Sequence, residues 1–185
     1  METAGQRPGM PNDWSPMTQL HEAPAARPFA LERDEGERIW FAGSAMTIKA
    51  SAATTGGLLS LIETLSPIGH GPPLHVHHDE DEAFYVIEGE LEIVCGQERY
   101  EAGAGAFAFL PRGIAHTFRV VSEVPVRMLT IAVPGGLENF FRDAGAPAEH
   151  DGLPPAGPIE VERIRQVSPR YGTEIVGPPI GVGRP

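Results

Sequence analysis

The chain has 185 residues, 41% of them hydrophobic, and a formal net charge of −11 from 25 acidic and 14 basic side chains. This negative surplus repels a phosphate backbone and argues against nucleic-acid binding, and no apolar run reaches the roughly 18 residues of a membrane span. Because Cys95 is the sole cysteine, neither an intrachain disulfide nor a thiolate cluster can form, so any metal must bind His, Asp or Glu.

Residues 1–30 are rich in proline and lack a periodic apolar pattern, so we expect an N-terminal arm that is partly disordered or docks on the remainder of the protein. Its candidate anchors are Trp14, Met17 and Leu20. The arm also lacks the apolar stretch typical of a signal peptide, which makes the cytoplasm the expected location.

Residues 31–134 contain short apolar runs separated by glycine and proline, which predicts an all-β domain. The run from Leu58 to Leu65 has helical propensity, but its flanking glycines and Pro67 favour a strand. Strands are expected around the motif at 69–89 and at 38–42, 45–50, 58–65, 90–94, 98–101, 106–110, 115–121 and 126–133. Their number and regular spacing indicate a sandwich or barrel.

Residues 135–185 form a different pattern, and we expect a C-terminal helical extension and tail. Leu137, Phe140 and Phe141 have helical spacing within 136–144, and a second short helix is predicted at 159–167. We expect both helices to pack on the outside of the barrel and the tail from Gly177 to be irregular.

The stretch from 69 to 89 contains a candidate metal site. His75 and His77 are two residues apart and therefore lie on the same side of a strand, whereas His78 lies on the other. A turn would bring Glu82 beside this pair, and His116 lies on a later strand. Three imidazoles and one carboxylate suit one divalent transition metal, namely Fe, Mn, Ni, Co or Zn, and leave coordination positions open for a ligand.

Isolated histidines and acidic turns usually have no such role. We therefore interpret His21, His70 and His150 as surface or ordinary packing residues, and the acidic run 79–81 as a solvated turn.

The spacing of the candidate ligands resembles the first motif of the cupin family. Gly69, His75, His77, Glu82 and Gly89 match that motif at every fixed position. The resemblance implies the cupin fold, a double-stranded β-helix or jelly-roll barrel, here with the proline-rich N-terminal arm and short C-terminal helices.

A second stretch resembles most of the second cupin motif, through Gly105, the turn at 111–113 and His116. Val120 stands where the family has Asn, so the sequence departs from the pattern there. The two motifs span 69–120. The resemblance implies a metal bound by His75, His77, Glu82 and His116.

Residues 72–90 and 135–149 resemble single-domain cupins of the quercetin 2,3-dioxygenase-like type. This implies a metal-dependent dioxygenase acting on an aromatic or enolisable hydroxy-ketone, with Glu82 also the general base. Two alternatives stay open: a metal-dependent isomerase or cyclase that does not use O₂, and a non-catalytic small-molecule-binding cupin. The family also implies a homodimer, to which the arm could contribute.

Several inward apolar positions could line a cavity for a flat aromatic substrate. The alternative is that they form ordinary core, and Val120 in particular could be core filling. The candidate lining residues are Met46, Phe84, Phe109, Phe118, Val120 and Met128.

Overall fold

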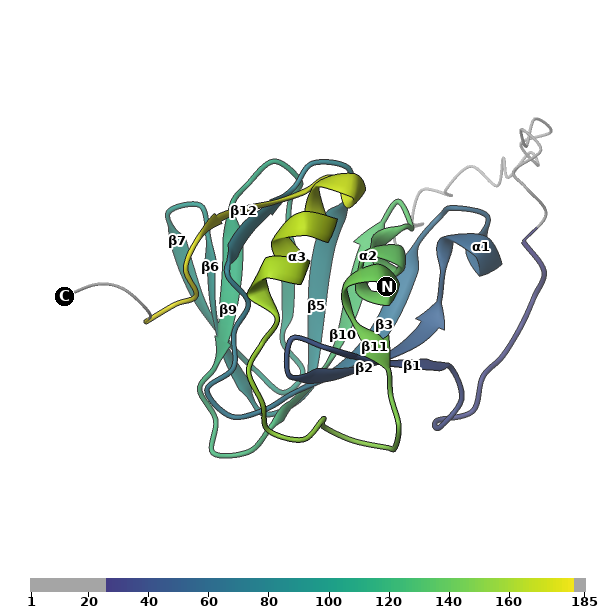
Figure 1. Cartoon of the computed structure of the whole chain (residues 1–185), viewed down its shortest axis with the longest axis horizontal. Helices are drawn as coiled ribbons and strands as arrows, with labels where there is room; N and C mark the ends of the chain where they lie inside the picture. The colour runs from purple at the N-terminus through teal and green to yellow at the C-terminus, as the bar shows by residue number, and fades with distance from the viewer. Residues whose placement is uncertain (1–25, 182–185) are drawn as a thin grey trace, which may run out of the picture.

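A computed structural model of the chain describes residues 26–181, in which two antiparallel sheets face each other (Figure 1). Residues 26–30 are exposed and have no regular structure, and the proposed anchors Trp14, Met17 and Leu20 lie outside the described residues. No helix between residues 26 and 181 has the length and apolarity required to cross a bilayer.

The larger sheet has seven strands. Their spatial order is β11 (Ala146–Pro147), β1 (Glu37–Phe41), β2 (Ser44–Ala50), β3 (Ser60–Ser66), β10 (Val126–Val133), β5 (Asp81–Glu88) and β8 (Phe107–Leu110). The run from Leu58 therefore contains a strand, as its flanking turn residues predict. Inward positions alternate with outward ones along β2, β3 and β10, because successive strand side chains point to opposite faces.

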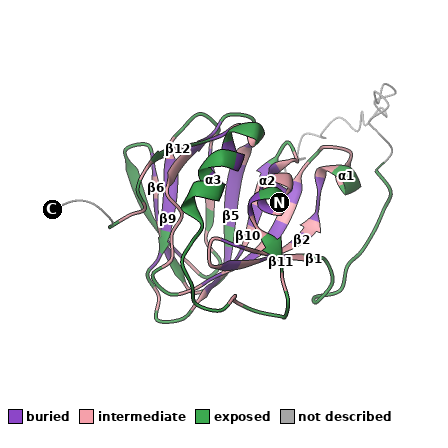
Figure 2. Ribbon diagram, viewed as in Figure 1, coloured by how far each residue is buried: buried purple, intermediate pink, exposed green. Residues whose placement is uncertain are grey.

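The smaller sheet has five strands, in the order β12 (Thr173–Gly177), β4 (Leu74–His77), β9 (His116–Val120), β6 (Glu90–Cys95) and β7 (Glu98–Gly103). Figure 2 shows the buried positions concentrated on strands such as β5 and β9, while the outer surface of α3 is exposed. The predicted all-β fold is confirmed, although β11 and β12 were not among the predicted strands.

The short helix α1 (Ala52–Thr55) was also not predicted. Ser51 and Thr54 form a reciprocal capping box at its start, and Gly56 ends it in the left-handed conformation. Gly56, one of the glycines that flank the run from Leu58, is therefore the C-terminal cap of one helical turn.

The C-terminal helices do more than cover the outside of the barrel. Helix α2 (Leu137–Ala144) and helix α3 (Val161–Val167) contact each other and the 3-10 turn η1 (Ser168–Tyr171). Their buried side chains join one core cluster with the strands, which contains Ile39, Phe41, Met46, Ile48, Ile62, Leu137, Phe140, Phe141, Ile164 and Val167. Burial of this apolar face, rather than helix propensity alone, holds these short helices in place.

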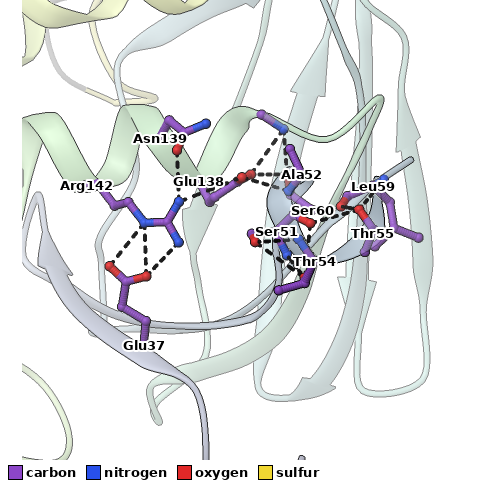
Figure 3. A network of polar contacts seen from close by, with 11 residues as sticks. Glu37, Ser51, Ala52, Thr54, Thr55, Leu59, Ser60, Glu138, Asn139 and Arg142 are labelled. Atoms are coloured by element: carbon purple, nitrogen blue, oxygen red, sulfur yellow. Dashed lines mark hydrogen bonds and ion pairs between the residues drawn. The ribbon is translucent and has the colours of Figure 1, made fainter. Parts of the chain in front are cut away.

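A buried carboxylate fixes helix α2 to the barrel. Glu138 is 1% exposed and accepts hydrogen bonds from the backbone of Ala52 and Gly136 and from the Ser60 hydroxyl (Figure 3). Arg142, one turn further along, pairs with Glu37 on β1 through two nitrogens. These polar contacts join α2 to α1, β3 and β1.

Candidate metal centre

The four predicted ligands come together between the two sheets. Strand β4 carries His75 and His77, strand β9 carries His116, and His75 pairs directly with His116 across the ladder. Glu82 comes from β5 of the facing sheet. One potential ligand atom from each of these residues lies within 4.8 Å of those from the others, so the cluster has the dimensions of a single-ion site.

Main-chain carbonyls orient two of the imidazoles. Nδ1 of His75 lies 2.8 Å from the carbonyl oxygen of Pro73, and Nδ1 of His116 lies 2.9 Å from that of Ile114. A carbonyl can only accept, so each Nδ1 is the protonated nitrogen and Nε2 carries the lone pair. This is the tautomer that a metal-binding Nε2 requires.

The third imidazole, that of His77, is held by side chains. Its Nδ1 lies 3.1 Å from Oγ1 of Thr173, a hydroxyl that itself donates to the carbonyl of Tyr171 and is thereby oriented to accept. Oε1 of Glu80 lies 2.8 Å from the same Nδ1 but outside hydrogen-bonding geometry, so its influence on His77 is chiefly electrostatic. Glu80 is 6% exposed, which corrects our interpretation of 79–81 as a solvated turn.

The donor set fits a divalent transition metal. Nε2 of His116 lies 3.1 Å and Nε2 of His77 lies 3.7 Å from Oε2 of Glu82. With Nδ1 of His116 committed to a carbonyl, a neutral His116 would set its Nε2 lone pair against the Glu82 carboxylate. A cation shared by these atoms removes that repulsion, and imidazole with carboxylate is a donor combination that such ions accept.

The pKa values favour ligand-ready protonation states. Burial, reinforced by the neighbouring His116 and His77, lowers the pKa of His75 to about 3. Burial alone would raise the pKa of Glu82, but the contact with His116 and the nearby imidazoles lower it to about 2. At neutral pH His75 is therefore neutral and Glu82 ionised, as metal binding requires.

His77 behaves differently from His75. Burial opposes its charged form, but the contact with Glu80 and the charge of Glu82 outweigh burial and raise the pKa of His77. Glu80 is therefore a residue of the site that the sequence analysis missed.

An ion pair anchors the loop beside the site. The backbone and the guanidinium of Arg112 donate to the carboxylate of Asp81, and Arg112 also donates to the carbonyls of Asp79 and Val133. The amide of Gly113 donates to the carbonyl of His77 over 2.8 Å. The turn at 111–113 thus ties the segment between His77 and Glu82 to the end of β8.

An apolar cavity opens from the cluster. His75, His77 and Glu82 lie in its wall together with four of the predicted lining residues, Met46, Phe84, Phe118 and Met128. The C-terminal elements also contribute, through Phe140 and Phe141 of α2, Ile164 of α3 and Ile175 of β12. The helices expected on the exterior therefore close this cavity.

Two predicted lining residues lie elsewhere. Phe109 is 56% exposed, because the inward positions of β8 are Ala108 and Leu110. Val120 is 1% exposed within a second core cluster with Leu91 and Ile93, so it is core filling, as the alternative interpretation held. Conversely, His70 lines the cavity, and burial lowers its pKa.

Comparison with known proteins agrees with the two-sheet fold. Residues 61–132 match the family model of the cupin domain, so this segment of the chain is a cupin domain. It also resembles the solved structure of an RmlC-like cupin from Shewanella frigidimarina, at a TM-score of 0.51 and 15% identity over 62% of this chain and 99% of that one. At this identity the likeness concerns the fold alone.

Among curated sequences, the chain is similar to quercetin 2,3-dioxygenase from Bacillus subtilis, at 32% identity over 146 residues. The match covers 78% of this chain but only 43% of that protein. An uncharacterised protein from Methanocaldococcus jannaschii is 28% identical over 75 residues, which cover 40% of this chain and 60% of that one. The aligned region thus spans about half the length of these relatives.

Proposed function

We propose that the chain is a metal-dependent dioxygenase of the quercetinase-like type, acting on an aromatic or enolisable hydroxy-ketone. The observation that carries the proposal is the opening of the His75, His77, Glu82 and His116 cluster into an apolar cavity. The similarity to quercetin 2,3-dioxygenase from Bacillus subtilis supports the same reaction class.

The apolar wall favours a flat, weakly polar substrate. Phe84 and Phe118 meet edge to face, with ring centroids 5.5 Å apart, and Met46 and Met128 lie in the same wall. Aromatic rings and thioethers provide dispersion contacts to a planar ring and exclude water from it.

In this proposal the four ligands bind one divalent transition metal, which supplies Lewis acidity and redox chemistry when bound. Glu82 accepts the proton of the substrate hydroxyl, and its depressed pKa keeps it ionised and able to do so. A carboxylate with so low a pKa is a weak base, so the transfer depends on a substrate hydroxyl made acidic at the site.

Oxygen uptake with a flavonol and diketone panel tests this function. Protein loaded separately with Fe, Mn, Co or Ni should consume O₂ with 3-hydroxyflavone or a 1,3-diketone, and Glu82→Gln should reduce the rate by about 100-fold or more. The loss of one ligand can itself empty the site, so metal content is measured beside the rate. Absence of uptake with every loaded metal would contradict the proposal, as would equal product formation under strict anaerobiosis.

A further inference from the structure

Two pairs of hydroxyl groups lie on the inner face of the larger sheet, within the cavity wall. Oγ of Ser44 lies 2.9 Å from Oγ of Ser66, and Oγ1 of Thr64 lies 3.1 Å from Oγ1 of Thr130. All four residues line the cavity, and none is more than 4% exposed. They are polar groups in an otherwise largely apolar wall.

Counting protons shows that each pair has a donor left over. A hydroxyl carries one hydrogen, so within a pair one O–H donates to the other oxygen and the second O–H must point elsewhere. Among residues 26–181, neither pair has a further hydrogen-bond partner. Burying an unused O–H is unfavourable, because the donor gives up water without replacement.

The register of the sheet places these donors in a line that leads away from the candidate metal centre. Thr130 of β10 pairs with Phe84 of β5, which lies two residues beyond Glu82. Met128, two residues from Thr130 along β10, pairs with Thr64 of β3. Successive steps of two residues are about 7 Å apart along a strand. Ser66 follows Thr64 by two residues on β3, and Ser44 contacts it from β2.

From this arrangement we infer that the hydroxyl pairs form a second subsite, which binds an oxygen acceptor on the part of the substrate remote from the metal. The inference rests on the proposed use of the cavity as a substrate site, and it narrows the substrate class. The ligand is a hydroxy-ketone that also carries a carbonyl or similar acceptor oxygen opposite its chelating edge. A purely hydrocarbon ring would leave both donors unused.

The test compares two probes of equal size on zinc-loaded full-length protein. Both 5-acetyltropolone and 5-isopropyltropolone chelate through the same hydroxy-ketone edge, but only the acetyl group presents an acceptor opposite that edge. Dissociation constants are measured by titration calorimetry for wild type, for the near-isosteric double variant Thr64→Val with Thr130→Val, and for Ser44→Ala with Ser66→Ala. Removing both partners of a pair avoids stranding one hydroxyl.

We expect at least one double variant to weaken binding of the acetyl probe by about three- to tenfold, with little change for the isopropyl probe. Thr117→Val is the matched control. Thr117 is also buried, but it does not line the cavity and its hydroxyl already donates to the carbonyl of Pro72, so its loss should leave the ratio of the two affinities unchanged.

Equal changes for both probes, no change in either double variant, or no binding of either probe would overturn the inference. Because each hydroxyl pair is removed in its own double variant, a folding defect in one variant still leaves the other variant as a test. The readout is binding to a zinc-loaded protein, so failure of oxygen-dependent turnover, which would sink the proposed function, does not decide this result.

Discussion

Oε1 of Glu80 lies 2.8 Å from Nδ1 of His77, the nitrogen on the side of the ring away from the other candidate ligands. Both side chains are buried, and their proximity raises the pKa of His77. A carboxylate behind a metal-binding imidazole keeps the proton on Nδ1 and makes Nε2 a stronger donor. Glu80 thus increases the basicity of His77, while the hydroxyl of Thr173 orients its ring.

Replacing Glu80 with glutamine should therefore weaken metal binding by about 10- to 100-fold. Competition with a chromophoric chelator measures the affinity. Asp79→Asn, an exposed neighbour in the same acidic run, is the control and should match wild type. An unchanged affinity in Glu80→Gln would show that Glu80 has no part in the site.

The ion pair between Asp81 and Arg112 should make stability depend on pH. Hydrogen bonds from Arg112 lower the pKa of Asp81 in the folded state. A carboxyl with a depressed folded pKa contributes stability above its unfolded pKa of about 4, and this contribution is lost as the pH falls through the folded value. Asp81→Asn should therefore be less stable than wild type at pH 7, and the difference should shrink in acid.

Urea unfolding at pH 7 and near pH 3 measures both differences. The pair is partly exposed, so the effect at pH 7 is expected to be modest. If the difference in stability between wild type and Asp81→Asn were the same at both pH values, the charge of Asp81 would contribute nothing to stability.

Truncating Glu138 should destabilise the fold strongly. Glu138→Ala leaves the Ser60 hydroxyl and the amide of Ala52 without their acceptor, whereas the amide of Gly136 still donates to Oγ of Ser60, and the loss should cost about 2–4 kcal/mol. Chemical denaturation measures the free energy of unfolding. Glu149→Ala, at an exposed position beyond the same helix, should change it by less than about 0.5 kcal/mol. Similar values for the two variants would contradict the role assigned to Glu138.

The predicted homodimer can be tested on the intact chain. We expect light scattering to give the mass of two chains. If the arm contributes to the dimer, a protein that lacks residues 1–28 should have the mass of one truncated chain. An unchanged dimer after truncation would exclude the arm, and a monomeric intact chain would refute the dimer itself.

Local patterns predicted much of this protein. Alternation and turn residues located most strands, and the spacing of His75 and His77 correctly put His78 on the outside, where it is exposed. Spacing also selected Glu82, which alternation along β5 directs inward together with Phe84.

The features that were missed depend on contacts between distant segments. Glu80 follows the end of a strand, where alternation no longer predicts direction, and its neighbour His77 is packed by Thr173, almost a hundred residues later. Strand β12 has a detectable alternation of Thr173 and Ile175 with Glu174 and Val176, but only pairing with β4 makes it a strand. Glu138 shares a helix face with Phe141, a spacing that could have indicated its burial.

Metal content tests the central claim most directly. Protein purified without added metal and analysed by elemental mass spectrometry should carry up to one transition-metal ion per chain, and loading with a divalent ion should saturate at one. His77→Ala should abolish that stoichiometry, while His78→Ala, on the exposed side of the same segment, should retain it. No metal in the loaded wild type, or equal metal in both variants, would contradict the assignment of His75, His77, Glu82 and His116 as one metal site.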